Sequence, residues 1–80
     1  MKMPRDLSGK DLIQRLKPYG YEGTRQSGSH IRLTTQKNGE HHITIPNHDP
    51  LKLGTLSSIL DIVAEHFHIT RNDLLQQLFF

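Results

Sequence analysis

Residues 30–46 have the sequence HIRLTTQKNGEHHITIP, in which two segments of alternating apolar and polar residues flank Lys-Asn-Gly. Such alternation is typical of strands with one buried face, so we expect strands at 30–36 and 41–46. A two-residue loop would place the apolar residues of the two strands on opposite faces. A three-residue loop, residues 37–39, places them on one face in the pairs Leu33–Ile43 and Ile31–Ile45. We therefore predict the longer loop, and Gly39 suits the left-handed position at its end.

The other face of this hairpin is polar. It is expected to carry no carboxylate, and its side chains are those of His30, Arg32, Thr34, His42 and Thr44. A magnesium-dependent nuclease needs carboxylates. Adjacent strand residues such as His41 and His42 point to opposite faces and do not readily share an ion. We predict no bound metal and no cofactor.

Two helix starts outside the hairpin share one pattern. Ser8 can cap a helix with Asp11 as its capping-box partner, and Thr70 stands in the same relation to Asp73. Leucines or isoleucines flank both caps at the spacing of a hydrophobic staple. The Pro-Tyr-Gly sequence at 18–20 ends the first helix.

The remaining segments complete the order of elements. Residues 21–26 are weakly strand-like, the Ser-Gly-Ser sequence at 27–29 indicates a turn, and residues 46–54 form a loop. Thr55 is expected to cap a second helix that runs to about Phe67. The order is then helix, three strands, helix and short helix. It predicts a two-layer α+β sandwich with a three-stranded antiparallel sheet, and α-β-β-β-α is also the order of double-stranded RNA-binding domains.

Length and composition narrow the class of protein. Eighty residues without cysteine suffice for one domain with one core, and they exclude a disulfide framework and a Cys-based zinc site. No segment approaches the roughly 18 apolar residues of a membrane span. The start, Met1 to Arg5, leads into polar residues without the apolar segment of a signal peptide. We expect a single cytoplasmic domain over residues 1–80.

The net charge of +2 is unevenly distributed. Residues 1–39 hold eight Lys and Arg against three acids, whereas residues 40–80 hold two against five. The first half therefore carries +5 and the second −3. This asymmetry favours one face for a polyanion, and ordinary surface scatter is the alternative.

Two short sequences contain groups that could act in catalysis or phosphate binding. In Gly28-Ser29-His30, a glycine turn places an imidazole on the polar strand face, where it can move a proton at physiological pH. The alternative is an ordinary surface histidine. In the second sequence, Lys52, Gly54 and Thr55 stand at a helix N-terminus, where free N–H groups favour phosphate. The alternative there is a tight turn with a cap.

Two strings together resemble a known family. The first is Arg25-Gln26-Ser27-Gly28-Ser29-His30 before an alternating strand. The second is Ile45-Pro46-Asn47-His48 followed by Leu51-Lys52-Leu53-Gly54-Thr55-Leu56 and Ile59-Leu60. In this order and spacing they resemble the HicA toxins of bacterial HicAB toxin–antitoxin systems, over about residues 7–75. The tail Leu78-Phe79-Phe80 departs from the family pattern.

The resemblance implies a function and a set of site residues. It implies a fold like that of a double-stranded RNA-binding domain and metal-independent cleavage of mRNA, with His30 as the catalytic residue, supported by Gly28 and Ser29. From the residues themselves, we expect RNA to be bound by Arg25, Arg32, His48, Lys52, Gly54 and Thr55. A HicB-like antitoxin would cover the site, and operator DNA would be bound only indirectly, through the antitoxin complex.

Two other functions stay open on the residues alone. The same fold could be a non-catalytic module that binds double-stranded RNA through phosphates and 2′-hydroxyls. Residues 56–66 and 71–78 could also form a helix-turn-helix that binds DNA. The second helix of that unit has only one basic residue, Arg71, which argues against it.

Overall fold

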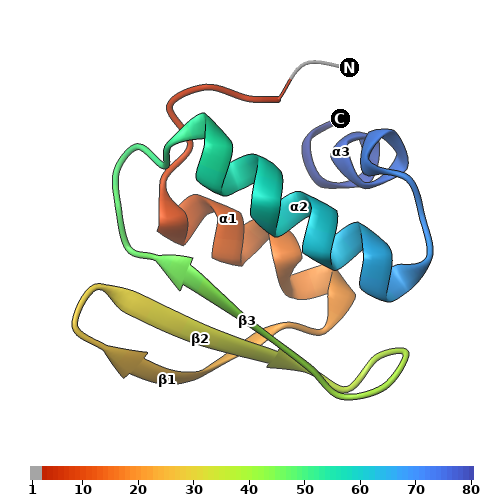
Figure 1. Ribbon diagram of the computed structural model, residues 1–80, viewed down its shortest axis with the longest axis horizontal. Helices are drawn as coiled ribbons and strands as arrows, with labels where there is room; N and C mark the ends of the chain where they lie inside the picture. The colour runs from red at the N-terminus through yellow and green to blue at the C-terminus, as the bar shows by residue number, and fades with distance from the viewer. Residues whose placement is uncertain (1–2) are drawn as a thin grey trace.

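The computed structural model describes residues 3–80, so Met1 and Lys2, on which the expectation about a signal peptide partly rested, lie outside the described residues. The elements are α1 (Gly9–Leu16), the 3-10 helix η1 (Lys17–Tyr19), β1 (Glu22–Ser27), β2 (His30–Thr35), β3 (His41–Pro46), α2 (Leu53–Phe67) and α3 (Arg71–Phe79). The strands form one antiparallel sheet in the order β1-β2-β3, with the helices on one side of it (Figure 1). The predicted α+β sandwich, with the element order of a double-stranded RNA-binding domain, is confirmed.

The hairpin of β2 and β3 has the predicted register. Leu33 lies opposite Ile43, and Ile31 lies opposite Ile45. The loop between the strands contains two left-handed residues, Asn38 with φ 56° and Gly39 with φ 95°, where one was expected. Asparagine tolerates this conformation better than most residues. The loop can therefore keep the length that the predicted register requires.

β1 and β2 are joined by a shorter turn than predicted. Ser27 is the last residue of β1 and pairs with His30, so only Gly28 and Ser29 form the turn. Gly28 has φ 57°, and a positive φ at the first of two turn residues is typical of the type II′ hairpin. The short turn makes His30 the first residue of β2.

The core lies between the sheet and the helices. It draws on β2, β3 and all three α-helices, and its buried members are Leu12, Leu16, Tyr21, Leu33, Ile43, Ile45, Leu51, Leu56, Ile59, Leu60, Val63, Ala64, Leu74, Leu75 and Leu78. Burial of this apolar surface is the main force that holds the two layers together. No helix within residues 3–80 is long and apolar enough to cross a membrane.

α3 packs into this core instead of presenting a surface for DNA. Leu74, Leu75 and Leu78 are buried. Its one basic residue, Arg71, donates to both carboxylate oxygens of Asp61 at 2.8 and 2.6 Å. This engaged guanidinium argues against the helix-turn-helix alternative.

The helix starts were predicted in two of three cases. Ser8 and Asp11 form both bonds of the capping box, at 3.0 and 3.2 Å, and Thr70 Oγ1 accepts from the Asp73 N–H at 3.0 Å. The cap at Thr55 was wrong, because α2 begins two residues earlier, at Leu53, without a side-chain cap.

Tertiary contacts explain the early start of α2. Leu51 is buried, and its N–H donates to the Leu7 carbonyl at 2.7 Å, which anchors the chain just before the helix. The Leu56 N–H then donates to the Lys52 carbonyl at 3.0 Å, so the first helical turn already encloses Thr55.

A histidine pair connects the hairpin to the end of α2. The rings of His41 and His66 are stacked with centroids 4.1 Å apart. His41 Nδ1 lies 2.8 Å from the hydroxyl of buried Tyr21, and His66 Nε2 donates to the Lys37 carbonyl at 2.9 Å. Burial, then the charges of His66 and His42, lower the pKa of His41 below its ordinary value. Burial also raises the pKa of Tyr21 to about 12.

We expect the free energy of unfolding to fall between pH 7.5 and pH 5. The unfolded chain protonates His41 near its ordinary value of about 6.5, whereas the folded chain does so only at lower pH. The unfolded state therefore binds more protons in this range and gains stability as pH falls. Each unit by which the pKa is lowered costs the fold about 1.4 kcal/mol at pH values below both pKa values.

Urea denaturation at pH 7.5 and pH 5 measures this loss, with His41→Gln as the comparison. The variant should lose less stability than the wild-type chain between the two pH values, and an equal loss would assign the effect to other groups. The lowered pKa values of Asp11, Glu40 and Asp61 act below about pH 4.5, outside the range compared.

Candidate nucleic-acid interface

The outer face of the sheet, turned away from the helices, carries the polar side chains that were predicted there. His30, Arg32, His42 and Thr44 are exposed, and Thr34 is half-buried. Their alternation with the buried residues of β2 and β3 follows from the confirmed register.

The prediction that this face carries no carboxylate is wrong. Glu22 of β1 lies opposite Thr34, and Glu40 Oε2 lies 3.3 Å from His42 Nε2. β1 adds a third strand whose outward residues include Glu22, and Glu40 precedes β3 and bonds back to it. Both carboxylates lie far from His30 along the sheet. Glu22 is paired with Thr34, and Glu40 contacts His42, which is also paired with Thr34; Thr34 follows His30 by four residues in β2.

His30 stands at the edge of this face beside the glycine turn. It pairs with Ser27 on one side and Pro46 on the other. The Asn47 N–H donates to the Ser29 carbonyl at 2.6 Å, so the chain leaving β3 stays against the turn. Histidine side-chain hydrogen bonds within residues 3–80 involve His41, His42 and His66, and none involves His30. Its imidazole is therefore exposed to a ligand.

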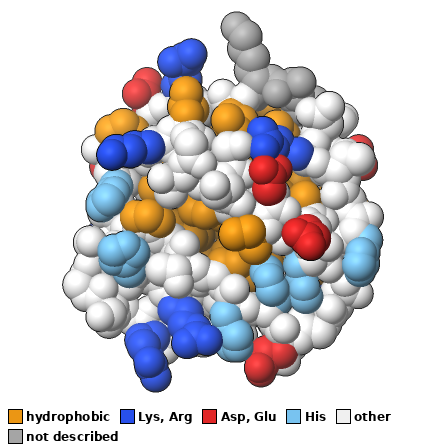
Figure 2. Space-filling view, in the orientation of Figure 1, with side chains coloured by type: hydrophobic (Ala, Val, Ile, Leu, Met, Phe, Trp, Pro, Cys, Tyr) orange, Lys and Arg blue, Asp and Glu red, His pale blue; other side chains and the backbone are white. Residues whose placement is uncertain are grey.

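A bulge in β1 creates a hollow on the same face. The pairing of β1 with β2 shifts between Gly23 and Arg25, so that Thr24 and Arg25 both turn outward. The hollow, about 320 Å³ in volume, is lined by Thr24, Arg25, Arg32, Thr34 and His42. Figure 2 shows Lys, Arg and His side chains along the side of the molecule that the strands occupy.

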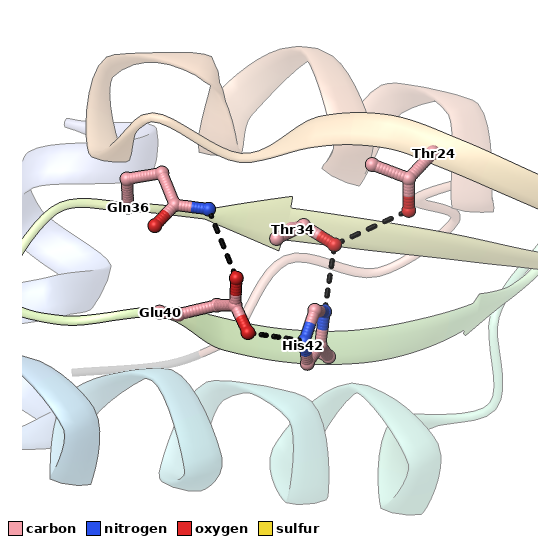
Figure 3. Close-up of polar contacts among 5 residues, drawn as sticks. All are labelled: Thr24, Thr34, Gln36, Glu40 and His42. Carbon is pink, nitrogen blue, oxygen red and sulfur yellow. Dashed lines mark hydrogen bonds and ion pairs between the residues drawn. The ribbon is translucent and has the colours of Figure 1, made fainter.

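A chain of hydrogen bonds crosses all three strands on this face (Figure 3). Thr34 Oγ1 lies 3.2 Å from Thr24 Oγ1 and 2.7 Å from His42 Nδ1. The other ring nitrogen, His42 Nε2, lies 3.3 Å from Glu40 Oε2, and Gln36 Nε2 donates to Glu40 Oε1 at 3.3 Å. The bond from Gln36, followed by that from His42, lowers the pKa of the Glu40 carboxyl. The His42 ring is thus held at both nitrogens.

The structure brings some of the predicted site residues together and leaves others apart. Arg25 and Arg32 meet in the hollow. The Asn47–Ser29 bond holds the start of the loop that contains His48 at the His30 end of the sheet, and the His48 carbonyl accepts from the Gly9 N–H at 2.9 Å. Lys52, Gly54 and Thr55 lie at the start of α2 and do not line the hollow.

Sequence reasoning missed three members of this face, Thr24, Gln36 and Glu40. An isolated glycine in a strand indicates a bulge, so Gly23 was the available sign for Thr24. Alternation over the predicted strand 30–36 was the available sign for Gln36, whereas nothing in that pattern marks Glu40, which lies in the loop before β3. Within residues 3–80, no group of three or more His, Cys, Asp or Glu side chains is arranged to hold a metal ion.

Comparison with known proteins identifies the family. A family model described as the HicA toxin of bacterial toxin–antitoxin matches residues 9–63, which is more than half of the chain. Searches of curated proteins and of solved structures found no significant match. The matched range includes the turn that presents His30, the hollow at the β1 bulge and the start of α2. The chain therefore belongs to the HicA toxin family of bacterial toxin–antitoxin systems.

Proposed function

We propose that this toxin is an endoribonuclease that cleaves mRNA without a metal ion, with His30 as general acid/base. The observation that carries the proposal is the exposed His30 imidazole, presented by the Gly28-Ser29 turn on the same sheet face as two arginines. Imidazole exchanges protons near neutral pH. A positioned group of this kind typically contributes about 10²–10⁴-fold to a rate.

The reaction needs one proton removed and one supplied. The 2′-oxygen of the RNA forms a bond to phosphorus, the bond from phosphorus to the 5′-oxygen breaks, and a 2′,3′-cyclic phosphate and a 5′-hydroxyl result. His30 would take the 2′-hydroxyl proton or donate to the leaving oxygen, with water as the second group. Gly28 and Ser29 would position the ring through the tight turn.

The cationic groups around this site would hold the RNA strand. Arg25 and Arg32 can bind phosphate oxygens through two N–H groups at once. His48 adds a donor beside the His30 end of the sheet, and Lys52 adds one at the start of α2. The free N–H groups of Gly54 and Thr55 at this helix start also favour phosphate. These contacts would bind RNA without reading its sequence.

Three further properties belong to the same proposal. A HicB-like antitoxin would bind over the outer sheet face, and operator DNA would be bound only through that complex. The chain would act in the cytoplasm as a single domain. One core cluster supports a single domain, since it extends from Leu12 to Leu78, beyond the C-terminal end of the matched range.

A substrate comparison tests the reaction itself. In the presence of EDTA, the purified chain should cleave a single-stranded RNA and leave the same sequence with 2′-O-methyl groups intact, because the methyl group removes the attacking hydroxyl. Products with cyclic phosphate ends are expected. Cleavage of both substrates, or cleavage only with added divalent cation, would overturn the mechanism.

The main alternative is a non-catalytic module that binds double-stranded RNA. The element order and the +5 charge of residues 1–39 favour it. Tight binding of an RNA duplex, together with intact single-stranded RNA at high protein concentration, would favour this alternative over cleavage.

A further inference from the structure

We propose that the hollow at the β1 bulge binds a second backbone phosphate of the RNA, and that His42 takes up a proton when that phosphate binds. The inference rests on the proposed function, since it assigns a further contact for the same single-stranded substrate. It concerns His42, which lies apart from His30 and which the resemblance to the family does not single out.

The charge pattern of the hollow calls for an anion. Arg25 and Arg32 lie opposite each other on neighbouring strands, and like charges in such positions repel. The ion pairs within residues 3–80 are His42–Glu40 and Arg71–Asp61, so neither of these arginines makes a direct ion pair, and Arg32 acts on the Glu40 carboxylate only through its charge. Two adjacent guanidinium groups without a direct carboxylate partner suit a phosphate, which accepts hydrogen bonds from both.

The hydrogen bonds around His42 can be satisfied in both charge states of the ring. The Glu40 carboxylate only accepts, so His42 Nε2 carries a proton in either state. In the neutral ring, Nδ1 accepts from the Thr34 hydroxyl, which in turn accepts from Thr24.

In the charged ring the direction of the chain reverses. Nδ1 donates to Thr34, Thr34 donates to Thr24, and Thr24 donates to the Arg32 carbonyl, 3.3 Å away. The two threonine hydroxyls rotate and no hydrogen bond is lost (Figure 3). Protonation of His42 therefore needs no rearrangement of the strands.

Charged and titratable groups near His42 lie on all three strands and in the loop before β3. Glu40 favours the charged ring, whereas neighbouring His41, Arg32 of β2 and Arg25 of β1 oppose it. On the α2 side, the adjoining groove presents the apolar Ile59 and Ile62. A phosphate between the arginines brings one negative charge that offsets part of the opposing positive charge, so phosphate binding and proton uptake strengthen each other.

This phosphate is different from the one at which His30 would act. Thr34, the partner of His42, follows His30 by four residues in β2. At about 3.3 Å per residue the two histidines are roughly 13 Å apart along the sheet, and a catalytic proton donor must come within about 3 Å of its target. His42 is therefore a binding residue further along the RNA strand.

The test is binding of a single-stranded 2′-O-methyl hexaribonucleotide, measured by fluorescence anisotropy at pH 5.5 and pH 7.5 at constant ionic strength. This probe lacks the reacting hydroxyl, and its phosphodiesters keep one negative charge over this pH range. The wild-type chain should bind about 3–10-fold more tightly at pH 5.5, as expected for a site that favours a charged imidazole.

His42→Gln should lose the part of this pH dependence that His42 supplies, so its affinities at the two pH values should differ less than those of the wild-type chain. The matched control is His68→Asn at the end of α2, where φ is 57° and asparagine fits the left-handed backbone; it should keep the wild-type pH dependence. Arg25→Gln and Arg32→Gln should each lower the slope of log K against log salt by about 0.7. Unchanged pH dependence in His42→Gln, or unchanged slopes, would overturn the inference.

The outcome separates this inference from the proposed function. If the chain cleaves RNA but His42→Gln binds the probe as the wild-type chain does, the phosphate site is wrong and the ribonuclease proposal stands. If the chain does not cleave RNA and the His42-dependent binding is observed, cleavage is wrong and the hollow remains a phosphate site.

Discussion

His30→Ala is expected to lower the rate of RNA cleavage by about 10²–10⁴-fold, because the site would lose its one positioned proton carrier. The ring is exposed and begins a strand, with no hydrogen bond to the rest of the described chain. Its removal should change the free energy of unfolding by no more than about 0.5 kcal/mol. Initial rates on a labelled single-stranded RNA, with EDTA present, measure the effect.

The comparison variants make this result specific to proton transfer. His30→Gln keeps hydrogen-bonding capacity but cannot titrate, so it should be as slow as His30→Ala. His42→Gln removes a different imidazole from the same face, roughly 13 Å away, and should raise KM with little change in kcat. If His30→Ala cleaves at the wild-type rate, or if His42→Gln has the larger effect on kcat, His30 is not the general acid/base.

Much of the fold could be predicted because its decisive contacts are local or periodic. The hairpin register followed from requiring that Leu33 and Ile43 share a face, and the structure pairs them. The Ser8–Asp11 cap involves residues three apart. Caps and hairpin registers join residues that are close in sequence, so local backbone geometry determines them before tertiary packing contributes.

The missed features depend on segments that are distant in sequence. α2 begins early because Leu51 is anchored to Leu7, a contact that no local propensity reveals. The same limit applied to the candidate site. His30 and Arg32 were predicted from alternation, whereas the bulge that brings Arg25 beside Arg32, and the loop that returns Glu40 to His42, exist only once the sheet has formed.

Gly9→Ala is expected to destabilise the protein by about 3 kcal/mol, although alanine is the better helix former. A Cβ at this position would lie 2.1 Å from the Pro46 carbonyl oxygen and 3.3 Å from Asn47 Cα, both backbone atoms. The Gly9 N–H donates to the His48 carbonyl at 2.9 Å, so α1 cannot move away without breaking that bond. The overlap should outweigh the helix preference, which is worth at most about 1 kcal/mol, and overpacking of this kind typically costs 1–3 kcal/mol or more.

Gly54→Ala supplies the matched control, since it makes the same change in the first turn of another helix. Nothing lies within 4 Å of a Cβ there, so the helix preference acts alone and stability should rise by up to about 1 kcal/mol. For a chain of 80 residues, each kcal/mol shifts the Tm by about 4–8 °C, so thermal denaturation should separate the two variants by 10 °C or more. Equal Tm values would show that α1 and the end of β3 are free to move apart. A low Tm for Gly9→Ala would instead show that this close approach, which also fixes the loop beside His30, is part of what holds the candidate site together.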